Sequence, residues 1–427
     1  MALDQRLKVT IHLESPLLIT RQQVGFVWES EEYIPGGVLR GAVAEVAARH
    51  GQDLKALFDR PNAPRFGHAY AGLGPPVGIL PQTARTCKRH SGFRRDGQDD
   101  ERHGVWDTLL LQVFGEMQTE ARCPICDQST APRGGETYVA IGSSEEWRYV
   151  SPGAIFRRIG RTAVARERGA VADRLLYTLE VIAEVMERDE LDDYGRPLRA
   201  ATVFHGFVWG DSADNLPWVK WLRGVNHLGG ARSRGLGQVR IEAEVEKTSL
   251  VTEDEMIQAA KHLTEGKPAT APDHSPNGMG LLDRILAFNQ KVYALENLKK
   301  EEHLKFWYFT VDLQSDTILG DVRRPCYWPG PADLGLPEPV ELMWWLARYG
   351  QVRGWSAAWG LPKPTIPALT AGSTFVYRVP RGDEDLTRQV LGRCITLERE
   401  GIGQHREEGL GWVQICTPFH LETEVRK

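Results

Sequence analysis

A glycine-rich motif occurs twice in the chain, and this repeat constrains the fold more than any other feature. Residues 229–241 and residues 403–415 both read G-x-x-R-x-x-G-L-G-x-V-x-I, with seven identical positions in thirteen. The Val-x-Ile ending of each copy alternates with the period of a half-buried strand. Each copy is therefore a glycine-rich loop that leads into a strand, and the repetition predicts two related domains that end in the same way.

The chemistry of the loop favours binding to phosphodiesters. Glycines permit positive φ angles and leave backbone N–H groups without side-chain cover, so the loop suits an anion or a closely approaching polymer backbone. The arginine adds a bidentate donor for phosphate. No Gly-Lys-Ser/Thr follows, as a nucleotide triphosphate loop requires, and the next element is a strand, whereas the dinucleotide-binding fingerprint needs a helix. The alternative is a glycine-rich hairpin that only turns the chain.

The size and charge of the chain set limits on its class. Its 427 residues have room for two or three domains, and the net charge of −5 means that any nucleic-acid binding comes from local patches. The first residues lack the apolar core of a signal peptide, and no run reaches the roughly 18 apolar residues of a membrane span. The six cysteines do not form the framework of a secreted protein. These features predict a cytoplasmic protein.

The elements before the first loop predict a ferredoxin-like domain. They are a strand at 7–13, a helix at 38–50, strands at 175–182 and 202–209, and a helix at 218–222. With the strand after the loop, this is the ferredoxin-like order. The first domain is predicted to span residues 1–250, with a Pro/Gly/Arg-rich insertion at about 60–175.

The start of the first helix is a second candidate anion site. Gly36 and Gly37 open it, so its first N–H groups are free, and Arg40 lies one turn further on. A plain connection from strand to helix is the alternative. Arg157, Arg158 and Arg161 belong to a basic run that suits an RNA channel, or else a solvated helix face.

The second half repeats the pattern after a linker. Residues 251–302 are predicted to form a helical linker that contains the Gly/Pro-rich stretch 266–278. Residues 303–427 form the second domain, with strands at 306–313 and 374–379 and a helix at 385–396 before the second loop. The predicted fold is α+β, with two ferredoxin-like domains.

Three cysteines of the insertion indicate a metal site. Cys87, Cys123 and Cys126 offer three thiolates, and either His90 or His103 completes a set of four ligands that suits tetrahedral zinc. Such a closed site is structural and would hold together an insertion that is poor in apolar residues. The alternative is a set of free thiols.

Several of these segments resemble one family. The residues Ile34 to Gly41 and the terminal G-x-x-R-x-x-G-L-G loop resemble the RAMP superfamily of CRISPR-associated proteins. Residues 354–373 look like the second domain of the Cas-five-type subunits of type III complexes. The middle stretch, with its segments 86–89, 103–110 and 123–126, is similar to the Csx-ten subunit of subtype III-D.

The resemblance implies two RRM-like domains that hold the 5′ tag of a CRISPR guide RNA (crRNA) in antiviral defence. Such a subunit caps one end of the effector complex and contacts the large signalling subunit and the backbone RAMP subunits. The residues expected to contact RNA are Gly36, Gly37, Arg40, Arg157, Arg158, Arg161, Gly229, Gly230, Arg232, Ser233, Arg234, Gly235, Gly237 and Arg406. Glu407 and Glu408 make the second loop less suited to phosphate, so that this loop could face a protein instead.

Two alternatives to a non-catalytic RNA-binding subunit follow from other residues. His227 lies two residues before the first loop, where a metal-independent, guide-processing endoribonuclease of the same superfamily would need a general base. The tryptophans could stack bases or anchor a partner in a purely scaffolding subunit. The four tryptophans considered are Trp344, Trp345, Trp355 and Trp359.

Overall fold

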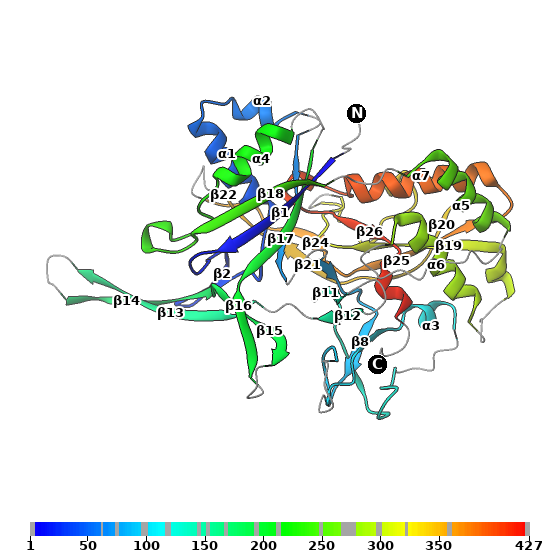
Figure 1. Cartoon of the computed structure of the whole chain (residues 1–427), viewed down its shortest axis with the longest axis horizontal. Coiled ribbons are helices and arrows are strands. Elements are labelled where there is room, and N and C mark those ends of the chain that lie inside the picture. The colour runs from blue at the N-terminus through cyan, green and yellow to red at the C-terminus, as the bar shows by residue number, and fades with distance from the viewer. Residues whose placement is uncertain are drawn as a thin grey trace.

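The protein has a mixed α+β fold with several small sheets, seen here in a computed structural model (Figure 1). The structure describes residues 5–60, 63–72, 77–94, 101–115, 121–142, 147–150, 154–165, 170–191, 196–210, 215–246, 251–265, 279–295, 301–320, 323–356 and 361–422. Two antiparallel sheets are the largest packed units, and each has its own hydrophobic core. None of the helices within these ranges is long and apolar enough to cross a membrane.

The first sheet has the strand order β18-β1-β17-β6-β4, and β5 also pairs with β17. Its strands are β1 (Gln5–Leu13), β4 (Tyr33–Ile34), β5 (Arg65–Phe66), β6 (Ala69–Ala71), β17 (Val203–Gly210) and β18 (Val239–Glu246). The helices near this sheet are α1 (Gly36–Arg49), α2 (Leu54–Phe58) and α4 (Asn215–Gly224). Apolar side chains of β1 and β18 alternate into the core with those of α1 and α4, as the period of each element predicts. The sheet places the chain's opening strand beside the strand that follows the first loop.

The strand predicted at 175–182 does not belong to this sheet. It is the end of β14 (Ala170–Ile182), which pairs with β13 (Phe156–Ala165) and lies parallel to β3 (Val27–Ser30), with β2 (Thr20–Val24) at the edge. The buried side chains of Leu179 and Val181 pack on Leu236 of the first loop. The predicted role was therefore wrong, because the short strands β5 and β6 take the expected place beside β17.

The second sheet has the order β20-β25-β19-β26. Its strands are β19 (Phe306–Leu313), β20 (Glu341–Leu346), β25 (Thr374–Pro380) and β26 (Val413–Ile415). Three helices share its core, and they are α5 (Glu253–Glu265), α6 (Leu281–Tyr293) and α7 (Glu384–Glu400). Helices α5 and α6, which the sequence assigned to a linker, are thus packed elements of this unit, while the stretch 266–278 lies outside the described residues.

The remaining elements form small sheets and single turns. The strands are β7 (Val77–Ile79), β8 (Ala84–Cys87), β9 (Val105–Asp107), β10 (Thr130–Pro132), β11 (Thr137–Gly142), β12 (Trp147–Val150), β15 (Val185–Leu191), β16 (Pro197–Ala201), β21 (Tyr349–Val352), β22 (Trp355–Ser356), β23 (Leu361–Pro362) and β24 (Ile366–Leu369). The short helices are α3 (Leu109–Val113), η2 (Arg232–Arg234), η3 (Glu301–Lys305), η4 (Ala332–Leu334), η5 (Arg406–Glu408) and η6 (Pro418–Leu421).

A buried charged triad joins β9 to the second sheet. His420 lies between two carboxylates, with Nδ1 2.5 Å from Oδ2 of Asp107 and Nε2 2.9 Å from Oδ1 of Asp312. All three side chains are almost fully buried. Burial alone would lower the pKa of His420, but attraction to Asp312 and Asp107 outweighs it and raises that pKa to about 10. His420 is therefore an imidazolium that donates a hydrogen bond from each nitrogen.

Candidate nucleic-acid interface

The first glycine-rich loop is held by close backbone packing. Its backbone takes positive φ at Gly229, Ala231, Gly235 and Gly237. A Cβ atom on Gly229 would lie 2.3 Å from the carbonyl oxygen of Leu18, and one on Gly237 would lie 2.0 Å from that of Leu228. No side chain fits at either position, so these two glycines are required by the fold itself.

Four backbone amides of this loop donate hydrogen bonds inside the protein. The N–H of Gly230 donates to Leu18 O and that of Gly237 to Pro16 O, both at 2.8 Å. The amides of Arg234 and Gly235 donate to carbonyls within the loop. These four amides therefore do not cradle phosphates as the sequence predicted, since forming the turn already engages them. The exposed side chains of the tip remain as candidates for ligand contact.

The tip of the loop, η2, presents Arg232, Ser233 and Arg234 to solvent. The guanidinium of Arg232 lies 2.8 Å from Oε2 of Glu45 on α1. Arg234 donates to the hydroxyl of Tyr177 on β14, and its guanidinium lies 5.6 Å from the centre of that ring. The hydrogen bond from Arg232 is the largest cause that lowers the pKa of Glu45. Both arginines are thus oriented by half-buried partners, and an anionic ligand can replace these contacts because the arginines themselves are exposed.

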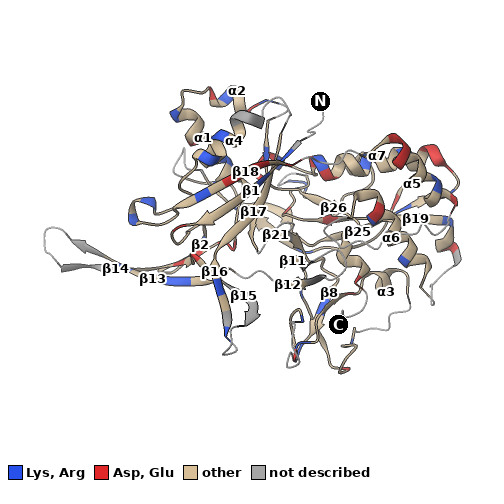
Figure 2. Cartoon of the chain, viewed as in Figure 1, with Lys and Arg blue, Asp and Glu red and all other residues tan. Residues whose placement is uncertain are grey.

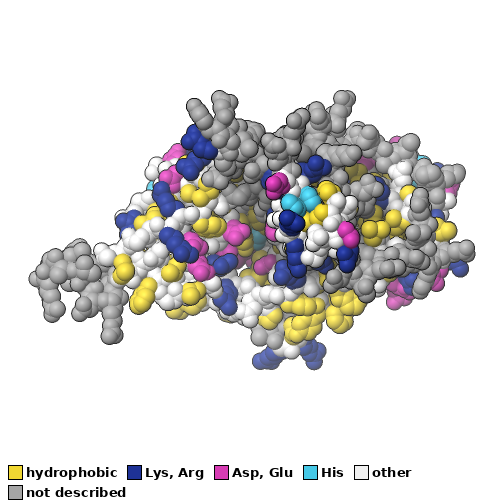
Figure 3. Space-filling view, turned by 90° about the horizontal axis from the view of Figure 1, so that it is seen from below, with side chains coloured by type: hydrophobic (Ala, Val, Ile, Leu, Met, Phe, Trp, Pro, Cys, Tyr) yellow, Lys and Arg dark blue, Asp and Glu magenta, His cyan; other side chains and the backbone are white. Residues whose placement is uncertain are grey.

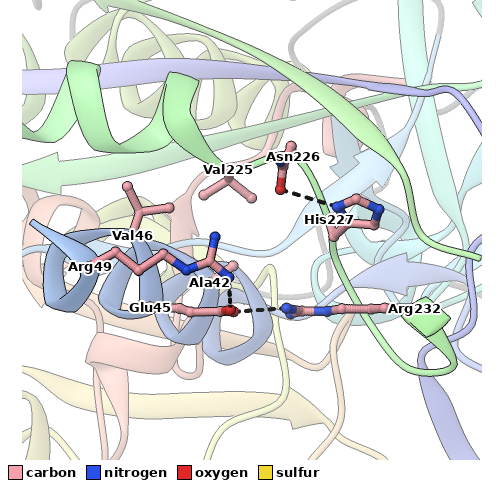
Figure 4. A pocket seen from close by; sticks show the side chains of 8 residues that line it. All are labelled: Ala42, Glu45, Val46, Arg49, Val225, Asn226, His227 and Arg232. Atoms are coloured by element: carbon pink, nitrogen blue, oxygen red, sulfur yellow. Dashed lines mark hydrogen bonds and ion pairs between the residues drawn. The ribbon is translucent and has the colours of Figure 1, made fainter.

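A pocket of about 130 Å³ opens beside this tip. Its lining residues are Ala42, Glu45, Val46, Arg49, Val225, Asn226, His227 and Arg232. Glu45 lies between the guanidinium groups of Arg49 and Arg232, and His227 lies across the pocket from them (Figure 4). Nδ1 of His227 is 3.1 Å from the side-chain oxygen of Asn226. The hollow thus combines two cations, an amide and an imidazole with the carboxylate of Glu45, which pairs with both cations. This set suits the polar edge of a base, or a phosphate that displaces Glu45.

The sequence did not identify Glu45, Arg49, Asn226 or Tyr177 as part of this interface. Glu45 and Arg49 are spaced i, i+4 on the predicted helix, a spacing typical of an ion pair on its surface. That pattern gave no sign that the pair would meet a loop almost 190 positions further along the chain.

The second loop has the same backbone shape but a different environment. Gly403, His405, Gly409 and Gly411 take positive φ at the positions that correspond to those of the first loop. Its tip, η5, packs against the start of α1 and against β5. A Cβ atom on Gly36 would lie 1.8 Å from Phe66 O and 2.6 Å from Glu408 O. The duplicated loop therefore covers the helix start that the sequence indicated as an anion site.

The side chains of the second loop bind other parts of the chain. Both carboxylate oxygens of Glu408 accept hydrogen bonds from Nζ of Lys363, at 2.6 and 2.7 Å. Arg406 donates to the carbonyl oxygen of Glu400 at 3.2 Å. The ring of Trp412 stacks on that of Trp209, with 5.7 Å between their centres. The contacts with Lys363 and Glu400 lie within the second half of the chain, and the stacking on Trp209 reaches the first half. That this loop faces a partner protein stays a prediction.

The start of α1, where the sequence predicted a groove shared with the first loop, makes several contacts within the chain. Gly36 and Gly37 lie against Glu408, and Arg406 lies with them. Arg40 donates to the carbonyl of Phe58 at 3.4 Å, and its guanidinium lies 5.0 Å from the centre of that ring. Gly36, Gly37 and Arg40 are therefore engaged by contacts within the chain.

The basic run lies on a strand, not on a helix. Arg157, Arg158 and Arg161 are on β13, whose partner β14 packs on the first loop. Arg157 pairs with Glu184 at 3.4 Å, and Arg158 pairs with Glu180 at 3.0 Å. In the coloured ribbon, Lys and Arg positions appear on this hairpin, and Asp and Glu positions appear on α5 and α7 at the other end of the molecule (Figure 2).

Four side chains of the insertion form a candidate metal centre. The ligand atoms of Cys87, His103, Cys123 and Cys126 all lie within 4.8 Å of one another. Sγ of Cys87 is 3.7 Å from Sγ of Cys126, and Nδ1 of His103 is 3.3 Å from Sγ of Cys123. His90 is not part of this set. Its ring stacks on that of His103, with 4.3 Å between the ring centres. Seen from below, histidine side chains lie among Lys and Arg side chains on this side of the molecule (Figure 3).

Comparison with known proteins gives only distant similarities. No family model matches the chain, and no curated protein matches its sequence. A chain of a type III-B Cmr-beta complex bound to cognate target RNA and AMPPnP is 11% identical, with 86% of each chain covered and a TM-score of 0.42. A chain of a type IV-B CRISPR complex is 12% identical, covering 58% of this chain and 93% of its own, with a TM-score of 0.25. A Cas6 mutant is 12% identical over 52% of this chain and 80% of its own, with a TM-score of 0.27. Similarities at this level do not establish a family.

Proposed function

We propose that the chain is a non-catalytic, RNA-binding subunit of a CRISPR effector complex. It would hold the 5′ tag of a guide RNA through the tip of its first glycine-rich loop. The difference between the two copies of the loop carries this proposal. One copy presents Arg-Ser-Arg to solvent beside a polar pocket, whereas the other, Arg-Glu-Glu, is packed on the chain's own first helix.

The proposed mechanism is positional. The guanidinium groups of Arg232 and Arg234 exchange Glu45 and Tyr177 for RNA phosphates, because a charge-assisted bond to phosphate is stronger than these exposed contacts. The hydroxyl of Ser233 adds a further donor. The adjacent pocket takes a splayed base or a phosphate, as single-stranded RNA recognition requires.

The same geometry gives no support to the endoribonuclease alternative. A general base needs a free nitrogen near the reacting hydroxyl and a second group to protonate the leaving oxygen. The contact of Nδ1 of His227 with the side-chain oxygen of Asn226 leaves Nε2 as the nitrogen that would act as the base. Glu45, the carboxylate of the pocket, is held between two arginines that lower its pKa, so it is a poor proton donor for the leaving oxygen. The pocket therefore suits binding better than cleavage.

We further propose that the chain consists of two ferredoxin-like domains of the RAMP type and that its insertion holds a structural zinc ion. Both large sheets place the first and third strands at the centre, as this fold requires. Three thiolates and one imidazole form a closed set of four, which fits tetrahedral zinc. A Csx-ten-like subunit of this kind would contact the large signalling subunit and the backbone subunits.

Binding of a single-stranded guide RNA to the full chain tests the proposal. Replacing both Arg232 and Arg234 by alanine should weaken binding at least tenfold and reduce the salt dependence by roughly one to two phosphate contacts. The matched control is the double variant Lys291→Ala with Arg388→Ala, which removes one cation from α6 and one from α7. It should bind RNA as tightly as the native chain does. Equal affinity of the two double variants would refute the proposal. Metal-independent cutting of repeat RNA that His227→Ala abolishes would favour the nuclease.

A further inference from the structure

Four aromatic side chains form an exposed surface at the edge of the second sheet. We call this the aromatic surface, and it consists of Tyr327, Trp328, Trp345 and Tyr349, whose exposed fractions are 49%, 48%, 43% and 54%. Two residues, Trp345 and Tyr349, lie on β20 and β21, and the other two lie on the segment before η4. Of the other tryptophans that the sequence indicated, Trp344 packs against the core, Trp355 is exposed on β22, and Trp359 lies outside the described residues.

The aromatic surface is ordered before any partner binds. The rings of Trp328 and Trp345 stack with 5.5 Å between centres and 28° between planes. The rings of Tyr327 and Tyr349 meet edge-on, and the hydroxyl of Tyr349 donates to Tyr327 O at 3.2 Å. Next to them, the buried hydroxyl of Tyr377 donates to Pro329 O at 2.6 Å and fixes the segment to β25. A ligand that stacks here loses little free energy in ordering these side chains.

The stretch that carries Trp345 and Tyr349 has charges of one sign, whereas the segment that carries Tyr327 and Trp328 is followed by the acids Asp333 and Glu338. Residues 342–382 contain no Asp or Glu, although 57 acids in 427 residues would place about five in a stretch of this length. The stretch keeps five cations, which are Arg348, Arg353, Lys363, Arg378 and Arg381. Glu341 and Glu408, outside the stretch, pair with Arg378 and Lys363. Arg348 and Arg353 thus flank Tyr349 along the chain without an acid between them.

We propose that the aromatic surface stacks the bases of a single-stranded RNA segment, while Arg348 and Arg353 bind its phosphates. Proteins that bind single-stranded nucleic acid without reading its sequence stack the bases on exposed aromatic rings and place cations beside them for the phosphates. The core of a protein interface is depleted of charges of both signs, whereas residues 342–382 lack only the acids. The inference rests on the proposed RNA-binding function and adds a second contact surface to it.

The test is binding of a short oligoadenylate that carries 2-aminopurine to the full chain. The variant Trp328→Ala with Trp345→Ala should bind roughly tenfold more weakly per stacked base and lose the quenching of 2-aminopurine fluorescence that stacking produces. Both side chains are half exposed, so the fold should persist. The variant Trp345→Phe keeps a ring and should keep most of the affinity, and Leu304→Ala, which removes exposed apolar surface from η3, should bind like the native chain.

The outcomes separate this inference from the proposed function. The inference is supported if the tryptophan variant binds the oligoadenylate more weakly than the native chain does, while the two proteins bind an abasic oligonucleotide with equal affinity. Native affinity and quenching in that variant, combined with weak binding by the Arg232 and Arg234 variant, overturns the inference and leaves the proposed function intact. No RNA binding by the native chain overturns both. A protein that copurifies with the native complex and is lost only from the tryptophan variant, at unchanged RNA affinity, makes this surface a protein interface and refutes base stacking.

Discussion

At the level of single residues, the insertion shows how two histidines in one short segment take different roles. The main-chain N–H of His103 donates to the carbonyl oxygen of His90 at 2.9 Å, so the two residues are held side by side. Only the ring of His103 faces the three thiols. The ring of His90 stacks behind it, and its Nδ1 lies 3.9 Å from the exposed carboxylate of Glu101. The contacts therefore make His103 the fourth ligand and His90 a support for its ring.

This assignment predicts a difference in metal content between two alanine variants. The native chain should contain about one zinc ion, His103→Ala should lose it, and His90→Ala should retain it, because three thiolates alone leave a tetrahedral site incomplete. Elemental analysis of the purified full chain measures this directly. The assignment fails if His90→Ala loses the metal while His103→Ala keeps it. If the native chain contains no zinc, the proposed metal site is refuted.

At the level of elements, the start of α1 is shaped by the second loop. The first residue of the helix, Gly36, has to be glycine, because a Cβ atom there would lie 1.8 Å and 2.6 Å from two carbonyl oxygens. Gly41 lies on the same helix, and a Cβ added there meets no atom within 4 Å. The two glycines thus form a matched pair, one in a crowded and one in an open position.

Substitution of these two glycines should have opposite effects on stability. Gly36→Ala should lower the free energy of unfolding by several kcal/mol, on the order of 3, since backbone atoms must shift. Gly41→Ala should leave it unchanged or raise it by up to about 1 kcal/mol, because alanine favours the helix. Urea unfolding of the full-length variants measures both. If Gly36→Ala is as stable as Gly41→Ala and loses RNA affinity instead, the helix start contacts RNA as the sequence predicted.

The elements also show why the sequence predicted only part of the fold and of the site. Residues 229–237 were found because their repeat is visible in the chain itself. The strands β5 and β6 have two and three residues, which is too short for an alternating pattern to show, so β14 was placed in their position. The covering of Gly36 by the second loop depends on tertiary contact between residues more than 370 positions apart, for which no local pattern exists. Glu407 and Glu408 gave the one local sign that the two loops differ.

At the level of the whole molecule, a few buried polar contacts connect parts that are distant in sequence. The triad of Asp107, His420 and Asp312 joins the insertion, the C-terminal η6 and the second sheet. Burial alone would raise the pKa of Asp312, but attraction to His420 and hydrogen bonds from Thr310 and Thr417 outweigh it and lower that pKa. Each charge therefore stabilises the charged form of its partner, and the connection depends on both.

The triad makes stability depend on pH in a defined direction. The pKa of His420 is raised from 6.5 to about 10 by folding, so its contribution is complete below about pH 6.5 and is lost as pH rises through about 10. Between these values the free energy of unfolding should fall by roughly 1.4 kcal/mol per pH unit because of this group.

His420→Gln should lower the free energy of unfolding by about 3–5 kcal/mol at pH 6, since two buried carboxylates lose their cation. In this variant, the part of the fall with pH that His420 causes should vanish. The exposed His405→Gln serves as the control and should follow the native curve. Urea unfolding from pH 6 to 9.5 measures these curves, and a native curve parallel to that of His420→Gln would show that His420 carries no buried charge.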